Sequence, residues 1–217
     1  MADKRRAGAQ KKSDQTRTRL MDSAAWVLKH RGYAGTRLSE IAERAGILPA
    51  NIYYYFESKD ALIEQVMHVG VVRGVETVQE SVEALGPDAS AEARLKAAIT
   101  GHLRHNLMMD DYASATIRSL GHVPEPIRER QIAVERAYGR YWAKLIEDCQ
   151  VAGSGRPDMH PSVVRMLMLG MLNWAVEWYR QGDRSPEQIA ELAVDLFFNG
   201  FGTGPRALPG SQNAGKD

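Results

Sequence analysis

Apolar side chains recur along this chain at spacings of three and four residues, the period of an amphipathic α-helix. In the first such stretch, residues 14–30, Leu20, Ala24 and Leu28 share one helical face. Gly32 follows as a natural left-handed cap, so we expect the helix to end there. No segment has the alternating pattern of a β-strand, and the chain is therefore predicted to be all-α.

Two short helices are predicted next. Thr36 is a good N-cap for a helix over 38–45, which Gly46 ends. Pro49 suits the first turn of another helix over 49–55. Because a glycine permits a sharp turn between them, the pair is predicted to form a helix-turn-helix.

Longer helices fill the rest of the chain. Ser58 is predicted to cap the first of them, and Ser185 with Gln188 forms a capping box at the start of the last. The apolar spacing predicts these helices over residues 59–84, 90–109, 112–120, 125–151, 160–181 and 186–199.

Charge is distributed unevenly along the chain, although the net charge is only +1. Residues 1–60 carry 12 Lys and Arg against 7 Asp and Glu, whereas residues 61–217 carry 16 against 20. A basic end on an acidic body indicates a polyanionic partner at one end only. The alternative is a basic tail that is merely solvated.

Composition is that of an ordinary globular protein, with 44% hydrophobic and 25% charged residues. No apolar stretch approaches the roughly 20 residues of a membrane span, and the basic N-terminus lacks the apolar core of a signal peptide. The single cysteine, Cys149, cannot form an intrachain disulfide and is predicted to be a small packing residue. These features favour a cytoplasmic location without a membrane contact.

The second short helix has side chains suited to reading DNA. Ile52 and Phe56 are predicted to face inward, which leaves Asn51 to pair with base edges and Tyr53 and Tyr54 to offer hydroxyls to phosphates. Such a helix enters the major groove. The alternative is a generic helical hairpin with an aromatic core. It leaves at least one residue unexplained, since three consecutive tyrosines cannot all face inward.

This segment resembles the signature of the TetR family of helix-turn-helix transcriptional regulators. The matching positions are Thr36, Ile41-Ala42, Ala45-Gly46-Ile47, Ile52-Tyr53, Tyr55-Phe56, Lys59 and Leu62. The resemblance implies phosphate contacts from Thr36, Tyr53, Tyr54 and Lys59, with Pro49, Ala50 and Asn51 nearest the bases. With Arg37, which precedes the first short helix, the predicted DNA-contacting set is Thr36, Arg37, Pro49, Ala50, Asn51, Tyr53, Tyr54 and Lys59.

Two positions depart from the family pattern. Many relatives have Ser at the position of Leu48 and Gly at that of Ala50. Leu48 cannot cap the second helix with a hydroxyl or donate to a phosphate. We therefore expect that helix to start on Pro49 alone.

The resemblance also implies how the chain is divided. Residues 1–13 are too polar to bury a face and are expected to form a flexible basic arm. A three-helix DNA-binding domain is expected over 14–60 and a helical ligand-binding and dimerisation domain over 61–201. Residues 202–217, rich in Gly and Pro, are expected to form a disordered tail.

Dimerisation is expected to use the last two helices, which are apolar over much of their surfaces, as Leu167, Trp174 and Leu196 illustrate. Two such helices from each subunit would form a four-helix interface, the arrangement the family uses. The alternative is an intramolecular core. A homodimer would place two helix-turn-helix units on a palindromic DNA operator.

The body is also expected to bind a small hydrophobic ligand. Residues 169–180 and 124–130 resemble, more loosely, a TetR subgroup that responds to acyl-CoA thioesters of fatty-acid or sterol breakdown. Such a ligand needs cations for its phosphates and an apolar tunnel for its acyl chain, although Met and aromatic residues at helical spacing are more often core. The predicted ligand set is Leu103, Leu107, Met108, Tyr112, Arg118, Tyr138, Trp142, Met171, Trp174 and Trp178.

Other activities lack the residues they need. His102 and His105 stand three apart, but no further ligand completes a metal site. No phosphate loop, nucleophile elbow or catalytic pair is evident, so neither a cofactor nor an enzymatic activity is expected. The leading hypothesis is a homodimeric repressor that an apolar ligand releases from its operator. The alternatives are a regulator of efflux or stress genes with a hydrophobic drug-like ligand, and a DNA-binding protein with no inducer.

Overall fold

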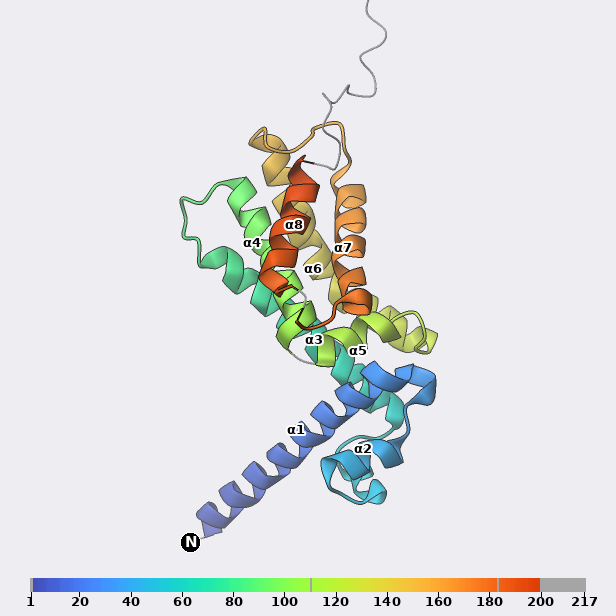
Figure 1. Ribbon diagram of the computed structural model, residues 1–217. Helices are drawn as coiled ribbons and strands as arrows, with labels where there is room; N and C mark the ends of the chain where they lie inside the picture. Colours follow the sequence, from blue (N-terminus) through green and yellow to red (C-terminus); the bar gives the residue numbers. More distant parts are fainter. Residues whose placement is uncertain (1, 110, 183, 200–217) are drawn as a thin grey trace, which may run out of the picture.

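The computed structural model describes residues 2–109, 111–182 and 184–199, which form helices and connecting turns without a β-strand (Figure 1). The prediction of an all-α chain is confirmed. The tail expected over 202–217 lies outside these residues. Within them, we find no helix with the length and apolar character required to span a membrane.

The first helix, α1 (Ala2–Gly35), projects from the body and begins well before the predicted residue 14 (Figure 1). Residues 2–13, expected to form a flexible arm, continue the same helix, because this stretch is rich in the helix formers Ala, Lys, Arg and Gln. Gly32 has a φ of +66° and kinks the chain at the position predicted for the helix cap.

The helix-turn-helix consists of α2 (Leu38–Ala45) and the short 3₁₀ helix η1 (Pro49–Tyr54). Gly46 lies between them with a φ of +69°, a backbone conformation that favours glycine, and its N–H bonds to carbonyls of the last turn of α2. The predicted cap of α2 is wrong. Arg37 occupies the N-cap position, and the Thr36 hydroxyl instead donates to the Gly32 carbonyl at 2.6 Å, because the kinked end of α1 presents that oxygen.

The body contains longer helices close to their predicted ranges. They are α3 (Lys59–Glu83), α4 (Ala91–Arg104), α5 (Asp111–Ser119), α6 (Glu125–Val151), α7 (Pro161–Trp178) and α8 (Pro186–Asn199). Ser58 caps α3, and Ser185 and Gln188 form the predicted capping box of α8. The sequence pattern did not predict that α4 passes into a π-helical turn, η2 (His105–Met109).

Two apolar cores stabilise this arrangement. In the first, Leu28 of α1 and Ile52 of η1 pack in one cluster with Met67 of α3 and Tyr112 of α5. The second is formed by α4, α6, α7, α8 and the later part of α3, around the fully buried Trp142. Because α3 contributes to both cores, the helix-turn-helix and the body are packed through a shared helix.

Candidate functional site

The helix-turn-helix exposes one polar and aromatic face of η1. Ile52 and Phe56 are buried, as predicted, and Tyr53 and Tyr54 therefore point outward with 61% and 81% of their surface exposed. Asn51 is exposed beside them. An amide and two phenolic hydroxyls are thus presented together on a short helix, where they can bond to base edges and phosphates.

Pro49 determines where η1 begins. Pro49 stands in the first turn, and the exposed Leu48 precedes it without a side-chain hydrogen bond to the helix, as predicted. Ala50 is exposed next to Pro49, and Arg37 is exposed at the start of α2. These side chains extend the η1 face on both sides.

Thr36 and Lys59, also predicted to contact DNA, are engaged within the protein. Thr36 is only 2% exposed. The Lys59 ammonium donates to the Tyr33 carbonyl at 2.9 Å and lies 4.6 Å from the centre of the Tyr33 ring. The Tyr33 hydroxyl donates to Asp60 at 2.8 Å, and burial, aided by Asp60, raises the pKa of Tyr33 to about 12. These bonds hold the end of α1 against the start of α3.

The body contains a half-open cavity of about 200 Å³, the inner cavity, lined by residues of α3, α4, η2, α5, α6 and α7. At the glycines in its wall, the absence of a side chain lets Thr116 approach Gly70, His105 approach Gly74 and Arg165 approach Gly139. Its polar lining residues are His102, His105, Asn106, Thr116, Glu135, Tyr138, Arg165 and Asn173, and its larger apolar ones are Val71, Ile117, Leu120 and Leu169.

His102 lies at the centre of a hydrogen-bond network in this wall. Its Nδ1 is 2.8 Å from the Tyr138 hydroxyl, and its Nε2 is 2.8 Å from the amide oxygen of Asn173. The amide nitrogen of Asn106 lies 3.1 Å from this oxygen and 3.1 Å from Nε2 of His102. The network joins α4, η2, α6 and α7.

Burial sets the ionisation of this network. Desolvation lowers the pKa of His102 to about 4, so the imidazole is neutral at physiological pH. Burial also raises the pKa of Tyr138, which stays a protonated donor. Desolvation raises the pKa of the Glu135 carboxyl, which lines the same cavity. His102 and Tyr138 are therefore uncharged at physiological pH, and the guanidinium in this lining is that of Arg165.

A more open cleft of about 590 Å³, the outer cleft, lies beside the inner cavity, and Ile117 and Asn173 line both. Its remaining lining residues are Arg118, His122, Gly170, Trp174, Glu177 and Arg180. Two guanidinium groups against one carboxylate give this cleft a positive charge. It can therefore attract an anionic group next to the mouth of the polar cavity.

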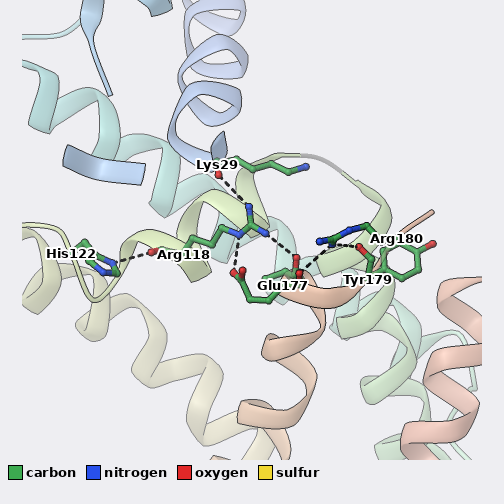
Figure 2. A network of polar contacts seen from close by, with 7 residues as sticks. Lys29, Arg118, His122, Glu177, Tyr179 and Arg180 are labelled. Carbon is green, nitrogen blue, oxygen red and sulfur yellow. Dashed lines mark hydrogen bonds and ion pairs between the residues drawn. The ribbon is translucent and has the colours of Figure 1, made fainter. Parts of the chain in front are cut away.

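Arg118, on α5, ties two other helices together beside the outer cleft (Figure 2). Its Nε donates to the Glu177 carboxylate at 2.8 Å and its Nη2 to the Val176 carbonyl at 3.0 Å, both at the end of α7. Its Nη1 donates to the Lys29 carbonyl at 3.2 Å, three residues before the kink of α1 at Gly32. Helix ends leave carbonyls without intrahelical partners, and Arg118 supplies donors to two of them at once.

The predicted ligand residues do not all lie together. Tyr138 lines the inner cavity, and Arg118 and Trp174 line the outer cleft. Leu103, Tyr112 and Trp142 are buried in the two cores, and Leu107 packs half-buried against the second. Met108, Met171 and Trp178 are exposed. Large apolar residues at helical spacing thus mostly belong to the cores or to an outer helix face.

Several lining residues were not predicted, among them Asn106, Glu135, Arg165 and Asn173. His102 and His105 were considered only as a metal pair. The described residues contain no cluster of three or more His, Cys, Asp or Glu suited to a metal ion. Nε2 of His105 instead lies 3.1 Å from the Gly70 carbonyl oxygen. The sequence feature that could have indicated this cavity is the presence of glycines inside helical segments, such as Gly70 and Gly139, where another side chain approaches closely.

The outer face of α7 carries a stripe of exposed apolar side chains, which we call the α7 stripe. Its members recur at helical spacing and are Val163, Met166, Leu167, Met171, Trp174 and Trp178. Leu192 of α8 is exposed as well. Contiguous apolar surfaces of this kind mark interaction sites rather than solvated faces.

Two family models match the chain. Residues 20–66 match the model described as bacterial regulatory proteins of the tetR family. Residues 88–201 match the model described as the C-terminal domain of tetracyclin repressor-like proteins. The chain is also 25% identical over 190 residues to the HTH-type transcriptional repressor KstR2 of Rhodococcus jostii, a match that covers 85% of this chain and 90% of that protein.

Solved structures share the fold. AibR, in complex with isovaleryl coenzyme A and operator DNA, superposes with a TM-score of 0.76 at 23% identity, covering 86% of this chain and 100% of that one. FadR from Bacillus subtilis, in complex with stearoyl-CoA, superposes with a TM-score of 0.70 at 17% identity, covering 85% of this chain and 99% of that one.

The buried His102 predicts a specific dependence of stability on pH. In the unfolded chain this histidine has the ordinary pKa of 6.5, whereas in the folded protein its pKa is about 4. Because the unfolded chain therefore takes up a proton first, the folded protein loses stability as the pH falls from 6.5 to 4. Between pH 7 and pH 4 the free energy of unfolding should fall by roughly 3 kcal/mol more in the wild type than in His102→Gln. Urea denaturation across this range measures the difference. Equal losses in the two proteins would show that His102 ionises normally.

Proposed function

Because the chain belongs to the TetR family of bacterial regulatory proteins, we propose that it is a homodimeric repressor that an acyl-CoA releases from a palindromic operator. Family membership makes it a helix-turn-helix transcriptional regulator and not an enzyme. Residues 14–60 would act as the DNA-binding domain, and residues 61–201 would bind the ligand and dimerise.

The exposed face of η1 supports operator binding. Tyr53 and Tyr54 project from a short helix whose apolar residue Ile52 is buried, so their hydroxyls can reach phosphates while the helix lies in the major groove. Asn51, with Pro49 and Ala50, would lie nearest the bases. The exposed Arg37 would add a cation at the start of α2.

Operator affinity should depend on the two exposed tyrosines. Tyr53→Phe and Tyr54→Phe should each weaken binding roughly tenfold, because each loses one charge-assisted hydrogen bond to phosphate of about 1.4 kcal/mol. Fluorescence anisotropy on a palindrome located by footprinting would measure this. Tyr55→Phe is the matched control, since Tyr55 is half-buried and should bind as the wild type does. Unchanged affinity in both test variants would refute the assignment of η1 as the DNA-reading helix.

The α7 stripe supports a homodimer through α7 and α8. A single helix-turn-helix makes few contacts with DNA, and such modules bind in pairs spaced by about one helical turn of DNA. Leu167 and Trp174, 67% and 66% exposed, lie on one helix and would meet their counterparts around a two-fold axis.

A charge placed in the α7 stripe should dissociate this dimer. Leu167→Arg would bury an unpaired guanidinium in the interface, so light scattering should give the mass of one chain where the wild type gives two. Val151→Arg is the control: Val151 is 90% exposed at the end of α6, outside the stripe, and the variant should stay dimeric. A dimeric Leu167→Arg protein would place the interface elsewhere.

The adjacent inner cavity and outer cleft support an acyl-CoA ligand. The outer cleft offers the exposed Arg180 to an anionic, phosphate-bearing moiety, and Arg118 adds positive charge beside it. The adjoining inner cavity offers space for an acyl group. AibR and FadR, which share this fold, were each solved with a CoA thioester. This side-by-side arrangement of a cationic cleft and a smaller cavity is the observation on which the ligand part of the proposal rests.

Titration of the operator complex with acyl-CoAs tests this part. Isovaleryl-CoA and butyryl-CoA should lower the anisotropy of labelled operator to that of free DNA, whereas free CoA, without an acyl group, should leave the complex intact. Failure of every thioester from butyryl-CoA to stearoyl-CoA to release the operator would reject an acyl-CoA inducer.

A further inference from the structure

Two charged side chains line the inner cavity without an ion-pair partner among the described residues. Arg165 reaches the cavity from α7 and Glu135 from α6. The guanidinium of Arg165 lies against the backbone at Gly139, where an added methyl group would overlap it. Glycine is a poor residue for the middle of a helix such as α6. The close approach of Arg165 explains why a glycine stands at this position.

The other polar groups of the wall already bond to one another. Tyr138, His102, Asn173 and Asn106 form a connected network in which each has a partner within 3.1 Å. Arg165 and Glu135 take no part in this network, and the side-chain partner of the Glu135 carboxyl is Gln131, outside it. A bound group that only fills space would separate both from water without replacing their hydrogen bonds.

The inner cavity is small. An apolar cavity of about 150 Å³ holds one benzene molecule. A cavity of about 200 Å³ accordingly has room for roughly eight non-hydrogen atoms. A short acyl group fits within it, whereas a long saturated chain would have to extend through its open side.

We propose that the inner cavity selects a short acyl group that carries a hydroxyl, through Arg165 and Glu135. This inference rests on the proposed acyl-CoA function and names the class of acyl group. A hydroxyl can both accept from the guanidinium of Arg165 and donate to the carboxyl of Glu135. A hydrocarbon can do neither.

Calorimetric titration of the full-length protein with paired thioesters tests the selectivity. 3-Hydroxybutyryl-CoA should bind at least tenfold more tightly than butyryl-CoA, which differs only by the hydroxyl. Stearoyl-CoA should also bind more weakly than 3-hydroxybutyryl-CoA, because it lacks the hydroxyl. Equal affinity for 3-hydroxybutyryl-CoA and butyryl-CoA would overturn the inference.

Variants assign the preference to the two side chains. Arg165→Met and Glu135→Gln should each reduce the hydroxyl preference to less than about threefold, because each removes one of the two groups that bond to the hydroxyl. Arg136→Met and Glu129→Gln alter exposed residues of the same helix and should keep the full preference. Gly139→Ala should also reduce it, because the methyl group displaces Arg165 without removing its charge. A preference that survives in both Arg165→Met and Glu135→Gln would contradict the assignment.

Thioesters without phosphates separate this inference from the proposed function. We would use the N-acetylcysteamine thioesters of 3-hydroxybutyrate and butyrate, which carry the same acyl groups as the CoA thioesters. If they bind with the hydroxyl preference and the CoA thioesters do not bind, the cavity inference stands and the CoA proposal fails. If CoA thioesters bind without a hydroxyl preference, the CoA proposal stands and the cavity inference fails. If neither series binds, both are wrong.

Discussion

Arg118 donates hydrogen bonds to α1, three residues before its kink, and to the last turn of α7, and so links the helix-turn-helix to the body in addition to their shared apolar core. The planar guanidinium presents several donors in a fixed fork, which a lysine cannot do. Two further bonds join α1 to the start of α5: Lys29 pairs with Asp111 at 2.8 Å, and Tyr112 donates to Asp22 at 2.8 Å. α1 is therefore bonded to the body at both ends of α5.

The position of Arg118 connects the proposed ligand site with the DNA-binding module. Asn173 lines both the inner cavity and the outer cleft, and it stands one helical turn before Val176 and Glu177, which Arg118 holds. A ligand that moves this part of α7 acts on bonds that also reach α1. α3 offers a second connection, since it begins beside the helix-turn-helix and contributes Gly70 to the cavity wall. A ligand alters DNA binding through such contacts only if it prefers one of two arrangements.

The elements of the fold were predictable because they follow local rules. Helical spacing, the Ser58 cap and the capping box of Ser185 and Gln188 depend on neighbours in sequence and are found in the structure. The cap at Thr36 was mispredicted because a kink at Gly32 offers its hydroxyl another acceptor. The inner cavity was mostly missed because its polar residues come from α4, η2, α6 and α7, and no local pattern marks their meeting. Trp142 and Leu103 were assigned to a ligand, whereas burial of apolar surface places them in the core.

The central claim is that ligand and operator are coupled through the α1–α5–α7 contact, and a binding cycle measures this directly. Operator affinity is measured with and without a saturating acyl-CoA, and acyl-CoA affinity with and without operator, in the wild type and in Arg118→Lys, which keeps the charge but not the fork. In the wild type, acyl-CoA should lower the affinity for operator, and operator should lower the affinity for acyl-CoA, by the same factor of at least about five. In Arg118→Lys, the separate affinities should stay within roughly twofold and the factor should fall toward one. A coupling factor unchanged in Arg118→Lys would contradict the account.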